Sequence, residues 1–201
     1  MTAVAAREPL RQDAGMDRTP CRHRLAVIAA AGLLLASCRE HAATRSPRPS
    51  YPGATVVDVS HVRFDDGDTF SVDGAPIRVL GIDTPEITDP AVGIFEDQPV
   101  GRAAAESTRV WITRARRVEV ALDGRDRYQR RLAHVFVDGD LLGERLLAAG
   151  LAYENVSYFG DNGFPDLADR ILRAADRGPK PAFEEPYKWR KKHQRRVAGA
   201  E

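Results

Sequence analysis

Three short segments of this chain bring carboxylates and arginines close together. DGDT occupies residues 66–69, RVLGIDTPE occupies residues 78–86, and GRDRYQRR occupies residues 124–131. Carboxylate oxygens are the ligands that Ca²⁺ prefers, and the planar guanidinium fork of arginine matches phosphate oxygens. These residue types therefore predict phosphate chemistry assisted by a metal ion.

Asp68 and Asp83 are the candidate metal ligands. Asp-Gly turns at residues 66–67 and 73–74 predict a three-stranded meander, in which the strand ending at Asp83 lies beside the strand carrying Asp68. Two carboxylates with a carbonyl and waters would make a weak Ca²⁺ site, suited to a calcium-rich exterior. The alternative is two unrelated aspartates at strand ends. An EF-hand is excluded, because Phe70 stands where a third oxygen ligand is required.

Arg78 and Glu86 flank Asp83 in the sequence. Arg78 lies five residues before Asp83, so a regular strand would put the two side chains on opposite faces. A bend at Gly81 would bring them to one side, and a solvated surface arginine is the alternative. Glu86 follows Pro85, whose ring fixes φ. A carboxylate held there beside a cation can orient or deprotonate a water molecule.

The third segment surrounds an aromatic residue with arginines. Its side chains are Arg125, Arg127, Tyr128, Arg130 and Arg131. Arginine can bind phosphate through two parallel hydrogen bonds, and tyrosine can add a hydrogen bond or a stacking surface. Several arginines on a strand are also typical of a solvated face. The neighbouring carboxylates and Arg78 favour the phosphate interpretation.

The N-terminal region predicts export and a lipid anchor. An apolar run of about a dozen residues, 25–36, is too short to span a bilayer and typical of a signal peptide. It ends in LASC at residues 35–38, which resembles a bacterial lipobox with Cys38 as the lipidated residue. An ordinary signal peptide or a buried helix is the alternative. Met16 gives a more usual signal length than Met1, and loss of Cys21 with the signal would leave no disulfide.

The remaining sequence predicts one α+β domain, mainly β. Expected strands are 54–64, 68–74, 75–82, 116–122 and 131–140, and expected helices begin at Pro99, Leu141 and Pro165. This order fits a five-stranded barrel of the OB type with about three helices packed against it. The predicted organisation is a signal peptide at 1–37, a lipidated tether at 38–52, the domain at 53–178 and a basic tail at 179–201.

Composition is that of a soluble globular protein, with 43% apolar and 29% charged residues in 201. The formal net charge is only +1, so any basic surface for a polyanion must be local. Six Lys and Arg between residues 188 and 196 make the C-terminal tail basic. We expect this tail to be solvated and mobile; contact with nucleic acid or lipid headgroups is the alternative.

Taken together, four motifs resemble the staphylococcal nuclease (thermonuclease) family over residues 53–176. They are DGDT at 66–69, RVLGIDTPE at 78–86, DRYQRRLAHVFVDG at 126–139 and LLAAGLAY at 146–153. The resemblance implies a Ca²⁺-dependent endonuclease that hydrolyses DNA and RNA, preferably single-stranded, to 3′-phosphate products. The implied partners are these nucleic acids, and the membrane through the lipid anchor; no protein partner is expected.

The resemblance also implies a role for individual residues. Asp68, Asp83 and the carbonyl of Thr84 would hold Ca²⁺, Arg78 and Arg130 would neutralise charge at the phosphorus, and Glu86 would be the base. Arg127 and Tyr128 would hold a terminal phosphate of the substrate, and Tyr158 would lie near its base and sugar. Two departures stand out: Val156 replaces a second tyrosine, and Gln129 replaces a glycine in the turn before Arg130.

The alternative function is a catalytically weak or inactive OB module that binds nucleic acid or protein. Such modules typically lose the arginines or the carboxylates, whereas Asp68, Arg78, Asp83, Glu86 and Arg130 are all in place here. A third hypothesis is a calcium-binding lipoprotein of the cell envelope, which would not need Arg78 or Arg130. A digestion assay of denatured DNA with Ca²⁺ or chelator separates the three.

Overall fold

The structure is a computed structural model that describes residues 49–195. The expected signal peptide, the lipidation site Cys38 and most of the tether lie outside the described residues. In chain order, the elements are β1 (Thr55–Val57), β2 (Val62–Phe64), β3 (Thr69–Val72), β4 (Ala75–Val79), β5 (Ile82–Asp83), the 3₁₀ turn η1 (Pro90–Val92), α1 (Gly101–Arg114), β6 (Val118–Arg125), β7 (Arg131–Val137), β8 (Asp140–Leu141), α2 (Leu142–Ala148), β9 (Tyr153–Glu154), α3 (Val156–Phe159), α4 (Pro165–Arg177) and α5 (Pro186–His193).

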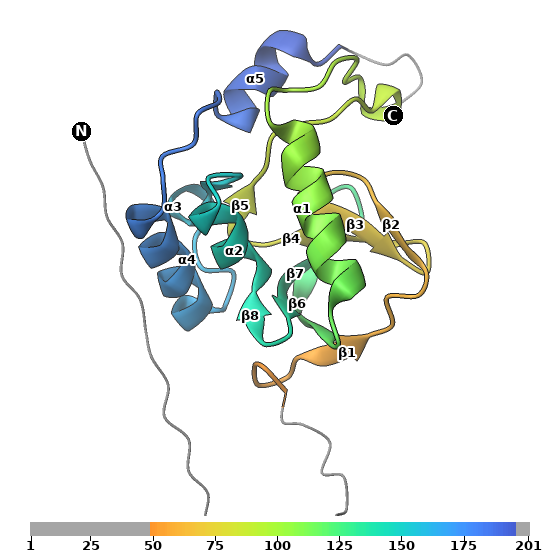
Figure 1. Ribbon diagram of the computed structural model, residues 1–201, viewed down its shortest axis with the longest axis vertical. Helices are drawn as coiled ribbons and strands as arrows, with labels where there is room; N and C mark the ends of the chain where they lie inside the picture. Colours follow the sequence, from red (N-terminus) through yellow and green to blue (C-terminus); the bar gives the residue numbers. More distant parts are fainter. Residues whose placement is uncertain (1–48, 196–201) are drawn as a thin grey trace, which may run out of the picture. The chain divides into compact units, whose positions relative to one another are not determined.

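Most strands belong to one curved sheet. Its order is β1-β6-β7-β4-β3-β2, with β8 paired to β7, and only the β4–β7 pair is parallel. The outer strands β1 and β2 are consecutive in the chain and joined by residues 58–61 alone, so the two edges of the sheet cannot lie far apart. The sheet accordingly curls (Figure 1), and the predicted α+β class with an OB-like sheet is confirmed.

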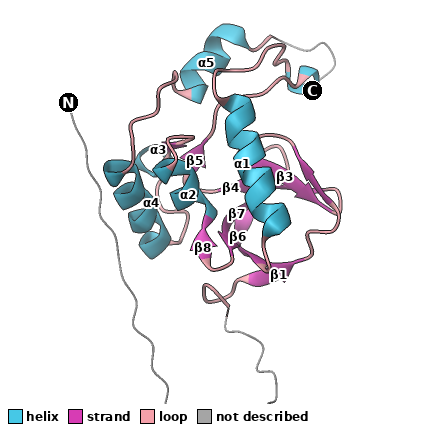
Figure 2. Cartoon of the chain, in the orientation of Figure 1, coloured by secondary structure: helices cyan, strands magenta, loops and turns pink. Residues whose placement is uncertain are grey.

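Helices close the open sides of this sheet. Figure 2 shows α1 crossing in front of the strands, while α2 lies between β7 and α4. Side chains from the sheet and from α2 and α4 fill one core. Its large members with almost no exposed surface include Phe70, Ile77, Ile82, Phe136, Leu142, Leu146 and Ile171, and α1 contributes Ile112.

The structure differs from the predicted elements in two respects: two expected strands are divided, and some short elements were not expected. The expected strand 54–64 is divided into β1 and β2, and the expected strand 75–82 is divided into β4 and β5. Short strands β8 and β9 and helices α3 and α5 were not predicted. Elements of two to four residues carry too few side chains to show a periodicity, which explains why the sequence did not reveal the shortest of them.

The break between β4 and β5 falls at Gly81. Its φ is +82°, a left-handed conformation that glycine adopts without a steric penalty. A Cβ at this position would also lie 3.2 Å from Cγ1 of Ile171 in α4. Gly81 therefore permits both the sharp bend and the close packing beneath it. The bend required for Arg78 and Asp83 to share one side is present.

The C-terminal segment differs from the expected solvated tail. Residues 186–193 form α5, in which Trp189 is 5% exposed, and Phe183 just before it is 8% exposed. Gln194 Nε2 donates to the carbonyl of Val92 at 2.8 Å, which extends the contact beyond the helix. Burial of two aromatic side chains favours docking despite the basic composition. As for the membrane, no helix within residues 49–195 has the length and apolar character needed to cross it.

His134 makes fold stability depend on pH. It lies on β7 with 2% exposure, its ring meets Phe164 edge to face at 5.2 Å, and burial lowers its pKa to about 4. In the unfolded chain the pKa is about 6.5. Stability is therefore complete above pH 6.5 and falls as pH drops toward 4, because only the unfolded chain takes up the proton. We expect a loss of about 3 kcal/mol over that range.

Urea unfolding of the wild type and of His134→Phe at pH 7, 5.5 and 4 measures this effect. The difference in unfolding free energy between the two should change by most of that amount, whereas His61→Gln, at an exposed position, should follow the wild type. Parallel pH profiles for wild type and His134→Phe would contradict the assignment.

Candidate active site

Arg78 gathers the two candidate metal ligands. Its guanidinium forms an ion pair with Asp68 through Nη1, and its Nη2 donates to Asp83 Oδ1 at 2.8 Å and to the carbonyl of Ile82 at 3.1 Å. Arg78 of β4 lies opposite Thr69 of β3, so Asp68, the residue before Thr69, lies close to Arg78. The bend at Gly81 returns Asp83 to the same side. The two predicted metal ligands thus converge on the guanidinium of a third predicted site residue.

Asp68 is fixed by a network of donors. Its exposure is 1%; Oδ2 accepts from the backbone N–H of Thr84 at 2.6 Å, and Oδ1 accepts from the hydroxyl of Thr69 at 3.1 Å. The preceding turn is closed by Asp66, whose Oδ1 accepts from the N–H groups of Asp68 and Thr69. Asp66 is thus a structural turn residue, and Asp68 presents its carboxylate with little rotational freedom.

Thr84, whose backbone carbonyl is the predicted third calcium ligand, follows Asp83 directly, and its N–H donates to Asp68 Oδ2. Among residues 49–195, its buried hydroxyl oxygen has no hydrogen-bond partner, and a Cβ added at Gly67 would lie 2.9 Å from it. No group of three His, Cys, Asp or Glu side chains arranged to hold a metal occurs in the described part of the chain. Two carboxylates and a threonine carbonyl would nevertheless form an all-oxygen donor set, which fits Ca²⁺ and does not fit softer metals.

Glu86 lies beside this cluster on a fixed backbone. Its carbonyl accepts from the N–H of Gln98 at 2.9 Å, and its own N–H donates to Gln98 Oε1 at 3.2 Å. The first residue of α1, Gly101, has no room for a Cβ because the Glu86 carbonyl occupies that space. Burial raises the pKa of the Glu86 carboxyl above its ordinary value, and the charge of Arg190 partly opposes that rise. A raised pKa suits a general base.

Arg130, Arg127 and Tyr128 lie on the hairpin between β6 and β7. Arg130 Nε donates to Asp126 Oδ2 at 2.7 Å, and Arg127 Nη2 donates to the Tyr128 hydroxyl at 2.7 Å. Both guanidinium groups approach the Tyr128 ring, at 4.8 Å for Arg127 and 5.5 Å for Arg130. Tyr128 itself is 63% exposed. These three residues form one exposed cluster, separate in its contacts from the Arg78 group.

Electrostatics link the hairpin to the carboxylates. Burial raises the pKa of the Asp66 carboxyl, while the charges of Arg78 and then of Arg130 act in the opposite direction. Asp66 closes the turn that holds Asp68, so the charge of Arg130 reaches that turn. The structure brings Asp68, Arg78, Asp83 and Thr84 into contact, and Glu86 joins them through Arg190. The ion-pair partner of Arg130 is Asp126 of its own hairpin.

Gln129 occupies the glycine position of the hairpin turn in a left-handed conformation, with φ of +64°. Asp126 maintains the turn, because its carbonyl accepts from Gln129 N and its Oδ1 accepts from the N–H groups of Tyr128 and Arg130. A non-glycine residue pays a steric cost in this region. We expect Gln129→Gly to raise the free energy of unfolding by about 1 kcal/mol.

Chemical denaturation tests this prediction, with Gln129→Ala as the matched control, because alanine retains the Cβ. Gly should be the more stable of the two variants. Equal stability of the glycine and alanine variants would show that the left-handed conformation carries no cost here.

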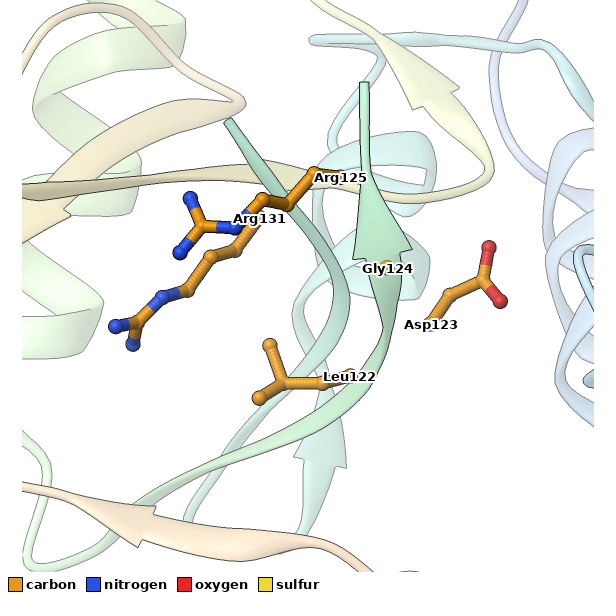
Figure 3. Close-up of a pocket in the computed structure, with 5 residues that line it drawn as sticks. All are labelled: Leu122, Asp123, Gly124, Arg125 and Arg131. Atoms are coloured by element: carbon orange, nitrogen blue, oxygen red, sulfur yellow. The ribbon is translucent and has the colours of Figure 1, made fainter. Parts of the chain in front are cut away.

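An open depression lies on the hairpin formed by β6 and β7. Its lining residues are Leu122, Asp123, Gly124, Arg125 and Arg131. Figure 3 shows the guanidinium groups of Arg125 and Arg131 extending to one side of the strands with Leu122, while Asp123 points away. Arg125 and Arg131 are direct cross-strand partners, and like charges at such positions repel. A bound anion would relieve that repulsion.

Tyr158 lies on α3 and is 81% exposed, with its ring edge to face against Phe159 at 4.7 Å. Asn155, at the start of α3, donates through Nδ2 to the carbonyl of Ile82 at 2.8 Å, which ties α3 to the strand of Asp83. Val156 is 8% exposed and belongs to the core, so it contributes no substrate surface. Tyr158 alone keeps the predicted aromatic position available.

One residue of the site was missed. Arg190 of α5 contacts Asp83 through both Nη atoms, at 3.0 and 3.3 Å, and pairs with Glu86. The sequence offered only a weak signal for this helix. Pro186 is a favoured helix-start residue, and Trp189, which the structure buries, stands among basic residues that follow it. One apolar position does not establish a helix face from sequence alone.

The segment that carries most of these residues is similar to known proteins. Residues 76–175 match the family model described as "Staphylococcal nuclease homologue". The chain is 35% identical over 96 residues to a thermonuclease of Staphylococcus hyicus, an alignment covering 45% of this chain and 55% of that protein. It is 36% identical over 104 residues to the SPbeta prophage-derived endonuclease YokF of Bacillus subtilis, covering 48% and 34%. The chain thus spans about half the length of the thermonuclease it matches.

Proposed function

The chain carries a domain of the staphylococcal nuclease family, and from that premise we propose that it is a calcium-dependent nuclease. Its substrates are DNA and RNA, single-stranded segments being preferred, and its products end in a 3′-phosphate. The observation that carries this proposal is the convergence of Asp68 and Asp83 on Arg78, with Glu86 beside them. Two metal-type carboxylates, a phosphate-type guanidinium and a base-type carboxylate form a complete set for phosphodiester hydrolysis.

Asp68, Asp83 and Thr84 would hold the calcium ion. When bound, the ion supplies Lewis-acid neutralisation of charge on the phosphate oxygens. Asp68 is pre-positioned for this role, because the Thr84 and Thr69 hydrogen bonds fix its carboxylate. In this structure Arg78 pairs with both carboxylates and Arg190 pairs with Asp83, so each guanidinium would have to release a carboxylate oxygen to the ion. Arg78 would then turn toward the substrate phosphate.

The protein groups divide the remaining chemistry. Glu86 accepts a proton from the water whose oxygen attacks the phosphorus, and the bond from phosphorus to the 5′ oxygen breaks. The leaving 5′ oxygen takes a proton from solvent water and departs as a hydroxyl group. Arg78 and Arg130 offset the negative charge that develops on the phosphate oxygens, which is where fixed cations contribute most. The low exposure of the Arg78 and Glu86 side chains, 15% and 14%, limits solvent screening of these interactions.

The exposed groups would hold the polynucleotide. Tyr128 and Tyr158 offer rings for stacking on unpaired bases, which double-stranded DNA conceals. Arg127 supplies a cation beside Tyr128, and the repelling pair of Arg125 and Arg131 would accept a further phosphate of the backbone. Stacking and phosphate contacts distinguish bases poorly, so little sequence preference is expected.

Export and a lipid anchor at Cys38 complete the proposal. They are supported by the apolar run 25–36 and the LASC sequence at 35–38. A position outside the cytoplasm would supply the millimolar calcium that a site with few charged ligands needs. Labelling of the intact chain with a radioactive fatty acid, compared with Cys38→Ser, tests the anchor.

Metal removal tests the activity. We expect the chain from residue 39 onward to digest denatured DNA with Ca²⁺ and to lose activity by at least about 100-fold in chelator, since charge neutralisation at the phosphate is lost. Release of acid-soluble nucleotides measures the rate, and readdition of Ca²⁺ is the control. Undiminished digestion in chelator would contradict calcium dependence. Binding of DNA without digestion would favour the non-catalytic OB module.

A further inference from the structure

Helix α5 delivers a third arginine to the site. Arg190 Nη2 lies 3.0 Å from Asp83 Oδ2, Nη1 lies 3.3 Å from Asp83 Oδ1, and Nη1 also pairs with Glu86. This is the fork-to-fork geometry that gives arginine–carboxylate pairs their directionality. Arg190 thereby links the proposed base to a proposed metal ligand, although it lies more than a hundred residues from either of them in the sequence.

The position of Arg190 is set by the fold around it. Trp189 is buried and its ring stacks on His193 at 4.3 Å. Ahead of the helix, the Phe183 carbonyl accepts from the Tyr153 hydroxyl at 2.7 Å, and Gln98 Nε2 donates to the Glu184 carbonyl at 2.5 Å. Gln98 also binds the backbone of Glu86. The helix that carries Arg190 and the loop that carries Glu86 are therefore anchored to each other independently of the ion pair.

Asp83 and Glu86 need a cation between them to keep a fixed geometry. Both carboxylates are largely buried, with side-chain exposures of 13% and 14%, and both carry negative charge toward Arg190. Arg78 also pairs with Asp83, but within residues 49–195 Arg190 is the only cation that pairs with Glu86. Without Arg190 the Glu86 carboxylate is repelled by Asp83 and regains its rotamers. A base displaced by a fraction of an ångström from its water loses much of its effect.

We propose that Arg190 is a positioning residue, which holds the Glu86 carboxylate at a fixed distance from Asp83 for attack on the phosphorus. This role rests on the proposed nuclease function and adds α5 to the parts of the chain that the reaction requires. Arg190 acts through the two carboxylates, so its effect falls on the chemical step. The opposite possibility, that Arg190 obstructs the site and restrains activity, predicts the reverse change on its removal.

The test is steady-state digestion of denatured DNA by the exported chain and its variants at saturating Ca²⁺. We expect Arg190→Ala to lower kcat by about 10-fold with KM changed less than twofold. Arg190→Lys, which keeps the charge but not the fork, should recover part of the loss. Lys191→Ala removes one charge from the exposed side of the same helix, where Lys191 lies over Tyr187 at 4.3 Å, and should behave as wild type.

A thermal double-mutant cycle of Arg190→Lys and Glu86→Gln supplies a readout that does not depend on activity. The two shifts in Tm should be non-additive, because the residues share one ion pair. Additive shifts, or an Arg190→Ala kcat equal to or above wild type, would overturn the positioning role while leaving the nuclease function intact. A wild-type chain that does not digest DNA would overturn the nuclease function itself, and with it any role of Arg190 in the reaction.

Discussion

Glu86→Gln is expected to lower kcat for denatured DNA by about 10²- to 10⁴-fold, because the amide cannot accept the proton of the attacking water. The substitution keeps the size of the side chain, and the backbone contacts with Gln98 do not involve the carboxylate. Initial rates of nucleotide release at several DNA concentrations separate the effect on kcat from that on KM. The loss should appear in kcat, since the group acts on the chemical step.

Glu106→Gln provides the matched control for this variant. Glu106 lies on the exposed side of α1, where its side chain is 56% exposed and pairs with Arg109. The same chemical change there should leave both kinetic constants unaltered. A Glu86→Gln enzyme with more than about one tenth of wild-type kcat would show that another group accepts the proton, since the expected loss is at least tenfold larger.

Arg78→Ala is expected to lower kcat and, when calcium is removed by chelator, to lower the free energy of unfolding. Loss of a fixed cation at the phosphate lowers kcat by about 10²- to 10³-fold. Asp68 would lose its ion pair with Arg78 while staying buried, and Asp83 would keep only Arg190. Breaking a buried ion pair costs about 3 to 5 kcal/mol. Calcium would offset part of that cost, because it binds the folded carboxylates and not the unfolded chain. Unfolding by urea with Ca²⁺ and with chelator measures both effects.

The control for Arg78 is Arg63→Ala on β2. Arg63 forms a comparable ion pair with Asp65 at 3.0 Å, but its side chain is 78% exposed. Surface pairs of this kind contribute little, so neither stability nor activity should change appreciably. If Arg78→Ala were as stable as wild type in chelator, Asp68 and Asp83 would not depend on Arg78 for compensation of their charge.

The local motifs carried most of the site because their chemistry is encoded over short distances. Asp68 precedes β3 and Asp83 lies on β5, just beyond the neighbouring strand β4, so pairing of consecutive strands was enough to predict that the two lie near each other. The bend at Gly81 was needed as well to bring Asp83 to the side of Arg78. The turn before Arg130 was equally readable, although the left-handed conformation of Gln129 shows that glycine was not essential there. Residue types and the residues that form a turn can be read from a few neighbouring positions, so the sequence alone is enough to predict them.

The sequence by itself determined the OB-like class, the carboxylates and arginines of the proposed reaction, and the turn residues that present them. Only the tertiary structure decided that Arg78 and Asp83 lie on one side, because that depends on the conformation adopted at Gly81 against Ile171. It also decided that Arg190 belongs to the site. The docking of α5 results from burying Trp189 and Phe183 against distant segments, and the net free energy of such contacts depends on the shape of the surface that receives them.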